Sequence, residues 1–266
     1  MLELANRNVI ESAEMRHSLG TFELRRNRLP DAIRELRRAL ELDPDLPGAH
    51  FSLGVAYRRS GRLDEAESAF ERLAQIDPGH PRLALERGLL FEARGEAARA
   101  VTAYQEALRD SADDMDLLLR LGAAQVAAGQ IDDAEGTLER VRQARPNSPE
   151  AAHFVGRVAF ARGRYAEALE QFRQAVTLDP TRGEFHLYVG WAAVENNQLG
   201  EALQSSERAL ERDPSLGEAY WVRAVVRLRS GRPADAVRTC SARSSCARAS
   251  TWRAPRWATP TISSCA

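Results

Sequence analysis

The sequence contains no lysine, and its first 239 residues contain no cysteine. All 37 basic residues are therefore arginine. GC-rich coding DNA explains this bias, and a selected preference for bidentate side chains is the alternative. The thiols of Cys240, Cys246 and Cys265 all lie near the C-terminus. A disulfide framework and a cysteine-based zinc site are thus excluded from residues 1–239.

The sequence also lacks long apolar runs and an even distribution of charge. No run approaches the roughly 18 residues of a membrane span. The N-terminal MLELANRNVIESAEM lacks the basic region and apolar stretch of a secretory signal, so we expect a cytoplasmic protein without membrane insertion. The net charge is −1, but no acid follows Asp235, whereas five arginines do. Residues 1–235 are therefore net acidic, which argues against nucleic-acid binding.

Motifs of catalysis are missing as well. The five histidines show neither an HExxH pattern nor a paired metal spacing, and the chain has no glycine-rich phosphate loop and no GxSxG. The acids mostly occupy polar positions of expected helices, where solvation accounts for them. We predict no enzyme activity, no cofactor and no metal site. A catalytic domain remains an alternative that loss of turnover on mutation of a histidine would support.

The sequence does contain a period of 34 residues. Glycine recurs at this spacing, alanine follows each glycine by 12 residues, and proline follows most of these alanines by a further 12. The seven repeats begin at residues 13, 47, 81, 115, 149, 183 and 217. The recurring residues are Gly20, Gly54, Gly88, Gly122, Gly156 and Gly190, then Ala32, Ala66, Ala100, Ala134, Ala168, Ala202 and Ala236, then Pro44, Pro78, Pro146, Pro180 and Pro214, with Ala112 in place of one proline.

Each repeat contains two helical stretches separated by Gly or Asn, which tolerate the left-handed backbone that stops a helix. Small residues at repeat positions 8 and 20 let antiparallel helices approach closely, and the proline at position 32 ends the second helix. One pair cannot bury its apolar face alone. We therefore predict an all-α, right-handed superhelical solenoid of about seven antiparallel helix pairs. The expected turn residues are Asn27, Gly61, Gly95, Gly129, Gly163, Asn197 and Gly231.

Two segments carry a family resemblance: HFSLGVAYRRSGRLDEAESAFERLAQIDP at residues 50–78 and HFVGRVAFARGRYAEALEQFRQAVTLDP at residues 153–180. They resemble the tetratricopeptide-repeat (TPR) family, and the resemblance covers residues 13–237. It implies a non-catalytic scaffold that binds a protein or peptide in a concave groove. The alternative is a regulatory or targeting segment of a larger protein, whose effector or enzyme domain is lost downstream.

In this family the first helix of each pair lines the groove, mainly through positions 2, 5, 6, 9, 12 and 13. The absence of Lys and Asn there argues against a clamp for a peptide carboxylate, whereas the apolar stripe suits a partner helix or extended segment. Trp191 and Trp221 are candidate anchors. Packing between adjacent helices is the competing interpretation for both, and for Phe51 and Leu85. The candidate binding residues are Phe51, Arg58, Leu85, Leu89, Leu119, Arg157, Leu187, Trp191 and Trp221.

The repeat breaks off after residue 237. Cys240, Arg243 and Arg248 occupy positions that should hold a large apolar residue, a small residue and proline. Restoring one base near codon 238 can return leucine, alanine and proline to these positions. We therefore interpret residues 238–266 as a frameshift product that leaves the last helix pair half-built, which could promote self-association. Residues 1–12 are either the remnant of an upstream repeat or a short capping segment.

Overall fold

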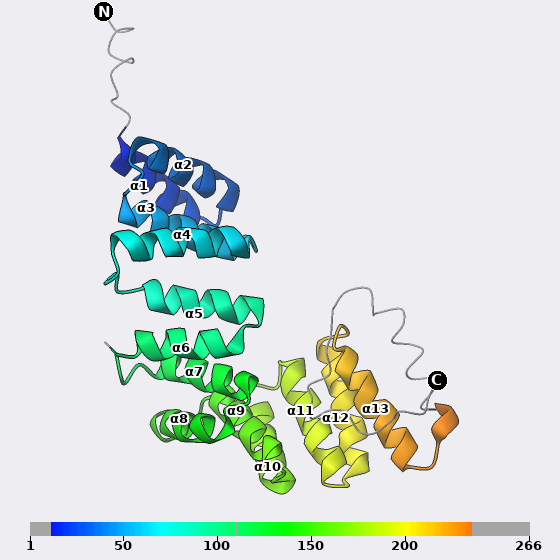
Figure 1. The fold of residues 1–266 in the computed structure, drawn as a ribbon. Helices are drawn as coiled ribbons and strands as arrows, with labels where there is room; N and C mark the ends of the chain where they lie inside the picture. Colours follow the sequence, from blue (N-terminus) through cyan, green and yellow to red (C-terminus); the bar gives the residue numbers. More distant parts are fainter. Residues whose placement is uncertain (1–11, 110, 236–266) are drawn as a thin grey trace, which may run out of the picture. The chain divides into compact units, whose positions relative to one another are not determined.

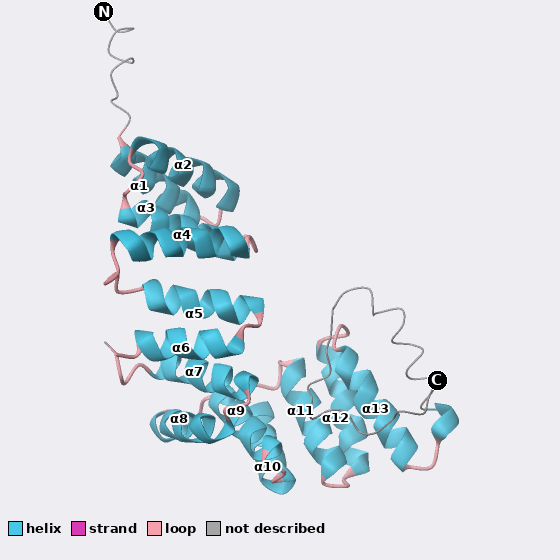
Figure 2. Ribbon diagram, in the orientation of Figure 1, coloured by secondary structure: helices cyan, strands magenta, loops and turns pink. Residues whose placement is uncertain are grey.

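The computed structural model describes residues 12–109 and 111–235, and their regular structure is entirely helical (Figure 2). This confirms the all-α prediction. The first helices of the repeats are α1 (Ala13–Arg25), α3 (Pro47–Arg59), α5 (Leu83–Arg94), α7 (Met115–Ala128), α9 (Pro149–Ala161), α11 (Gly183–Glu195) and α13 (Gly217–Arg229). The second helices are α2 (Leu29–Leu42), α4 (Leu63–Ile76), α6 (Ala97–Ala107), α8 (Ile131–Ala144), α10 (Tyr165–Leu178) and α12 (Leu199–Arg212). Residues 233–235 begin a further turn, and the predicted frameshift tail (238–266) lies outside the described residues.

Helix starts follow the sequence period closely. Every first helix begins at the predicted first residue of its repeat except α5, which begins at Leu83, two residues after Pro81. Proline suits the first helical position because its missing N–H would be unsatisfied there in any case, and Pro47 and Pro149 hold that position. Ser148 caps α9 by accepting a 3.1 Å hydrogen bond from the Ala151 N–H.

The turns between the paired helices are set by their Gly and Asn residues. All seven predicted turn residues have a positive φ, between 58° and 76°. Asn27 and Asn197 are the two described non-glycine residues with this conformation, which asparagine tolerates better than most L-residues. The left-handed residue reverses the chain after each first helix, as the sequence predicts.

The chain divides into two compact units, residues 1–124 and 125–266. In unit 1, successive helices from α1 to α6 pack against one another (Figure 1). In unit 2, successive helices from α8 to α13 do the same. The second helices α2, α4, α10 and α12 therefore each contact both their own first helix and the first helix of the next repeat.

The close approach of paired helices depends on small residues. The described alanines at position 20 are at most 1% exposed: Ala32, Ala66, Ala100, Ala134, Ala168 and Ala202. At position 8, a Cβ added to Gly156 would lie 2.6 Å from the Phe172 ring, and one added to Gly20 would lie 2.6 Å from Leu36. The glycine thus makes room for the large side chain at position 24, and this interlocking forms the core.

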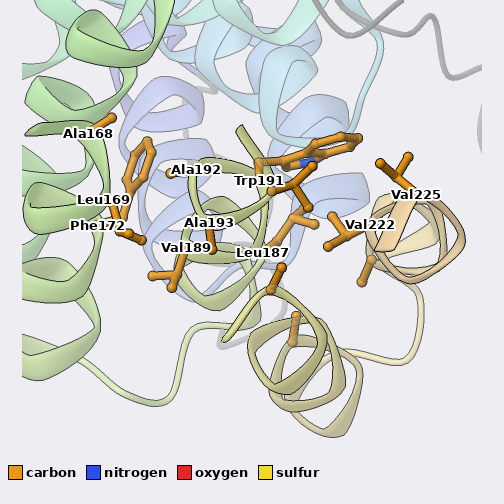
Figure 3. Packing of buried hydrophobic residues seen from close by; sticks show 14 of the residues in the cluster. Ala168, Leu169, Phe172, Leu187, Val189, Trp191, Ala192, Ala193, Val222 and Val225 are labelled. Atoms are coloured by element: carbon orange, nitrogen blue, oxygen red, sulfur yellow. The ribbon is translucent and has the colours of Figure 1, made fainter. Parts of the chain in front are cut away.

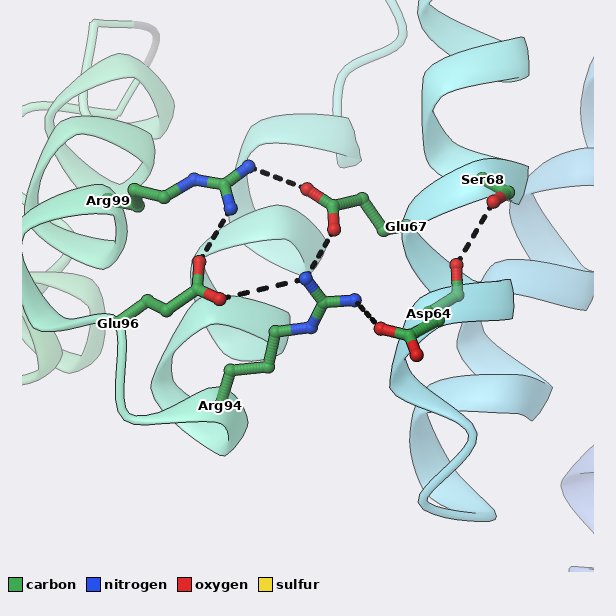
Figure 4. A network of polar contacts seen from close by, with 6 residues as sticks. All are labelled: Asp64, Glu67, Ser68, Arg94, Glu96 and Arg99. Atoms are coloured by element: carbon green, nitrogen blue, oxygen red, sulfur yellow. Dashed lines mark hydrogen bonds and ion pairs between the residues drawn. The ribbon is translucent and has the colours of Figure 1, made fainter.

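Arginine–carboxylate networks join neighbouring repeats at the protein surface. Arg94 at position 14 contacts Asp64 and Glu67 of the preceding repeat, and Glu67 and Glu96 also bind Arg99 (Figure 4). In unit 2, Arg162 repeats this pattern with Asp132 and Glu135, at 2.5 and 2.8 Å. Asp64 and Asp132 lie on solvated faces, as expected, and these acids also bridge repeats, whereas Glu35 and Glu86 are buried.

Candidate interaction surface

The first helices of unit 1 present a half-buried aromatic side chain. The Phe51 ring stacks on the His80 ring with centroids 4.5 Å apart and planes 29° apart. The Arg82 guanidinium lies 5.3 Å from the centre of the same ring. His80 and Arg82 both lie in the loop between α4 and α5, so this loop covers part of the Phe51 ring.

Beside His80 a cleft of about 290 Å³ opens within unit 1. Its walls come from the C-terminal part of α4, the α4–α5 loop, α5 and the end of α6. Ala74, Pro78 and Leu83 supply apolar wall, and Arg87 and Glu106 supply charge. Because His80 borders both this cleft and Phe51, the two features form one continuous patch.

Arg58 does not offer a free positive charge. Its Nε and Nη2 both donate to Glu86 Oε2, at 3.1 and 2.8 Å, across the α3–α5 contact. The Glu86 side chain is only 5% exposed, and Arg82 lies 3.6 Å from its other oxygen. The pair therefore neutralises itself, and charge-assisted hydrogen bonds of this kind fix the geometry of both side chains.

The remaining candidates in unit 1 are leucines. Leu85 and Leu89 lie one turn apart on α5, and Leu119 lies at the equivalent position on α7. All three are half-buried, so each packs on a neighbouring helix and keeps a solvent-exposed part. Together with Phe51 they give unit 1 an accessible apolar surface. We call the part formed by Phe51, Leu85 and Leu89 the α3–α5 surface.

Two candidates in unit 2 lie within the core. Leu187 is 5% exposed and Trp191 is 9% exposed, and both belong to the buried cluster around α11 (Figure 3). Trp191 lies beside Leu187 and points toward Val225 of α13. Trp221 is half-buried and packs at the edge of this cluster. A partner could therefore reach Trp221 more readily than Trp191.

Arg157 lies over an aromatic cluster on α9 and α11. Its guanidinium is 5.4 Å from the centre of the Phe154 ring and 5.5 Å from that of Tyr188. These distances fit cation–π contacts. The rings of Phe154 and Tyr188 in turn pack edge-on against His153, with centroids 5.1 and 4.7 Å away.

His153 is buried and has no hydrogen-bond partner among the described residues. Its side chain is 2% exposed, and its Nε2 lies 3.6 Å from Glu184 Oε1. Burial, reinforced by the positive charges of Arg157 and Arg182, lowers the pKa of His153 to about 3. The imidazole is therefore neutral at physiological pH, and its role is packing among aromatic rings rather than proton transfer.

The other core histidines have structural partners. His50 and His186 occupy position 4 of their repeats, and each Nε2 bonds to a proline carbonyl six residues earlier, at 2.8 Å to Pro44 and 3.1 Å to Pro180. Within the described segments, no three His, Cys, Asp or Glu side chains gather as a metal site would require. Nor does any described helix have the length and apolar character needed to cross a membrane.

Family models described as tetratricopeptide repeats match residues 18–81 and 189–245, residues 92–158, and residues 149–182. The chain belongs to the tetratricopeptide-repeat family. The matched residues include Phe51 and the whole of α9, whereas Leu85 and Leu89 fall between two matched segments. Tetratricopeptide repeats serve as protein-interaction scaffolds, and the chain is a scaffold of this kind. None of the curated proteins matches the sequence.

Solved structures share this tetratricopeptide-repeat fold at low sequence identity. A tetratricopeptide repeat protein from Parabacteroides merdae has a TM-score of 0.74 at 17% identity, over 88% of this chain and 92% of its own. PilF from Pseudomonas aeruginosa has a TM-score of 0.63 at 18% identity, over 80% of this chain and 96% of its own. YrrB, described as a tetratricopeptide-repeat protein with an unusual peptide-binding site, has a TM-score of 0.54 at 20% identity, over 71% of this chain and 97% of its own.

The repeat numbering shows which surface residues the sequence reasoning missed. Glu86, Phe154 and Tyr188 all occupy position 6 of a tetratricopeptide repeat, a position expected to line the groove. Comparing position 6 with position 12 of the preceding repeat would have placed Glu86 beside Arg58. His80 lies outside the first helices, so nothing in the repeat pattern indicated its stacking on Phe51.

Proposed function

We propose that this protein is a non-catalytic scaffold that binds an apolar helix or extended segment of a partner protein on its first helices, with the α3–α5 surface as the main contact. The half-exposed side chains of Phe51, Leu85 and Leu89 support this proposal most strongly. Leu119 and Arg58 are further candidate contacts of unit 1. In unit 2, Trp221 and Arg157 are separate candidate contacts, and Leu187 and Trp191 pack beneath them in the core.

The state of the arginines favours an apolar ligand over an acidic one. Arg58 is held by Glu86, and Arg157 lies over two aromatic rings. An acidic peptide that binds Arg58 would have to break the Arg58–Glu86 pair and leave the buried Glu86 carboxylate with only the more distant Arg82, which is costly. Covering leucine and phenylalanine side chains requires no such exchange, and it gains about 25 cal/mol for each Å² of apolar surface removed from water.

The two units contribute differently in this proposal. In unit 1 the apolar side chains are partly exposed without any rearrangement. In unit 2 Leu187 and Trp191 already pack in the core of that unit, and Trp221 provides its accessible edge. Affinity is therefore expected to depend more on Leu85 and Leu89 than on Leu187.

A peptide selection tests this proposal with a defined ligand. Peptides are selected from a library against the full-length protein, and their dissociation constants are measured for variants by fluorescence anisotropy. The double variant Leu85→Ala with Leu89→Ala should weaken binding by about tenfold or more, because truncated contact leucines each cost on the order of 1 kcal/mol.

The matched control is Leu42→Ala. Leu42 is also an exposed leucine of unit 1, at 40% exposure, but it lies on the second helix α2. This control should bind as the unmodified protein does. A peptide that loses affinity with Leu42→Ala and not with the α5 double variant would overturn the proposed surface, and a selection without binders would overturn the proposed peptide function.

A further inference from the structure

The first helix of the described array carries an exposed apolar stripe. Met15 and Leu19 are each 41% exposed, and Phe22 is 52% exposed. They are spaced by four and three residues on α1, so they lie on one face of the helix. Only Ala13 and Gly20 of α1 are buried. The Arg26 guanidinium covers part of Phe22, at 5.4 Å from its ring centre.

In every later repeat two of these three positions are covered. Met15 and Phe22 occupy positions 3 and 10, and the residues equivalent to them are at most 7% exposed. Those at position 3 are Ala49, Leu83, Leu117, Ala151, Phe185 and Ala219, and those at position 10 are Ala56, Leu90, Ala124, Val158, Ala192 and Val226. The exposure of α1 is therefore a property of its place in the array, not of its residue types.

The contact between α10 and α11 shows what covers these positions. Phe185 at position 3 packs with Ala175 and Val176, at positions 27 and 28 of the preceding second helix. Leu169 and Phe172, at positions 21 and 24, face Val189 and Ala192 of α11 (Figure 3). The face of α1 is thus shaped to receive the last turns of a second helix.

The chain before α1 has the matching register. Counted back from Ala13, Leu2 falls at position 24 and Ala5 at position 27. Position 24 is buried in every later described repeat, at Leu36, Phe70, Tyr104, Leu138, Phe172 and Ser206. Residues 9–12 then span the same four positions as the linker 43–46 between α2 and α3. The sequence MLELANRN before this linker contains Leu, Glu, Ala and Arg, which favour helix formation.

We propose that residues 1–8 dock on the Met15–Leu19–Phe22 face as the last two turns of a second helix. Ala5 covers Met15, and Leu2 covers Leu19 and the near edge of Phe22. A helix of eight residues is not stable alone in water, so its formation is coupled to docking. This docked segment caps the array and removes an exposed apolar face that would otherwise promote association.

Disulfide trapping in the full-length chain tests this contact. In a background with Cys240, Cys246 and Cys265 replaced by serine, the pair Ala5→Cys and Met15→Cys is compared with the pair Ala5→Cys and Ser18→Cys. Both pairs are tethered by similarly short segments, so the tether alone gives similar rates. Docking brings only the first pair within disulfide geometry, and its intramolecular disulfide should form at least about tenfold faster.

Hydrogen exchange provides a second measurement that does not depend on cysteines. Leu2→Glu should raise the exchange rates of α1 amides several-fold relative to those of α3, because the docked turns protect α1. Glu3→Gln, which changes a neighbouring position that is not expected to be buried, should leave them unchanged.

Equal trapping rates for the two cysteine pairs, or α1 exchange that is insensitive to Leu2→Glu, would overturn the proposal. Disulfides that form mainly between molecules, together with a concentration-dependent dimer, would show that a second copy covers the face instead, which also overturns it.

Discussion

The same repeat positions have different surroundings in the two units. At positions 5 and 9, unit 1 carries Phe51, Leu85 and Leu89 half-buried, whereas unit 2 carries Leu187 and Trp191 buried. Their helices differ accordingly. In α11 ten of the 13 residues are buried, and its only charged residues are Glu184 and Glu195, near its ends. In α5 five of 12 residues are buried.

The difference shows that repeat position alone does not decide whether a residue is available to a partner. Neighbouring side chains also matter, and position 6 differs between the units. In unit 2 the Tyr188 ring packs against the Phe172 ring, whereas in unit 1 Glu86 binds Arg58.

The largest expected effect comes from truncating the buried tryptophan. Trp191→Ala should destabilise the protein by about 3–5 kcal/mol, because it leaves a large cavity in the core of unit 2. Leu89→Ala in unit 1 should cost about 1 kcal/mol, since its side chain is half-exposed. Urea unfolding followed by circular dichroism measures both values. Equal losses would remove the proposed distinction between the two units.

The next largest effect is a pH dependence of the stability, caused by His153 of unit 2. The pKa of His153 lies near 3 in the folded protein and near the ordinary value of about 6.5 in the unfolded chain. Below about pH 6.5 the unfolded chain therefore binds a proton at His153 that the folded protein does not. The contribution to stability is complete above about pH 6.5 and is lost as the pH falls toward 3. Between pH 7 and pH 5 the loss should be about 2 kcal/mol.

His153→Leu should remove this part of the pH dependence, because the leucine does not titrate. Thermal unfolding of the unmodified protein and the variant at pH 7, 6 and 5 makes the comparison. Parallel curves for the two proteins would show that other groups cause the acid sensitivity.

A smaller effect is expected from the charged pair of unit 1. Glu86→Gln keeps the size of the side chain but removes its charge, so the hydrogen bonds to Arg58 weaken and stability should fall by about 1–2 kcal/mol. The same change frees the positive charge of Arg58. Binding of acidic peptides to the variant should therefore increase, as titration by anisotropy can measure, and no gain would argue that Glu86 does not set ligand charge.

The smallest change in stability is expected from removing an exposed ion pair between repeats. Arg162→Ala should change stability by less than about 1 kcal/mol, because its partner Asp132 is 94% exposed and exposed ion pairs contribute little. Urea unfolding at low and high salt tests this value. A loss as large as that of Trp191→Ala would mean that the surface networks, rather than the cores, stabilise the array.

Much of the fold could be predicted because it is carried by a few strongly constrained residues. The turn residues needed a left-handed backbone, so Asn27 and Gly61 marked the chain reversals. Position-20 alanines marked the helix contacts. The early end of α6 at Ala107 was not predicted, although Ala112 had already marked its repeat as the one without proline.

The candidate surface was less predictable because it depends on pairs of neighbours in different repeats. The Arg58–Glu86 pair joins residues 28 positions apart, and its geometry becomes evident only when α3 and α5 are packed. The burial of Trp191 had a sequence signal, since the segment around it is apolar on all sides, as expected of a fully buried helix. Whether the surface binds a partner stays a prediction.

The most direct measurement is methyl NMR of the full-length protein during titration with a selected peptide. Binding on the α3–α5 surface should shift the methyl signals of Leu85 and Leu89 and leave those of Leu187 in place. Shifts confined to Leu187 and its neighbours in unit 2, with Leu85 and Leu89 unaffected, would contradict the account.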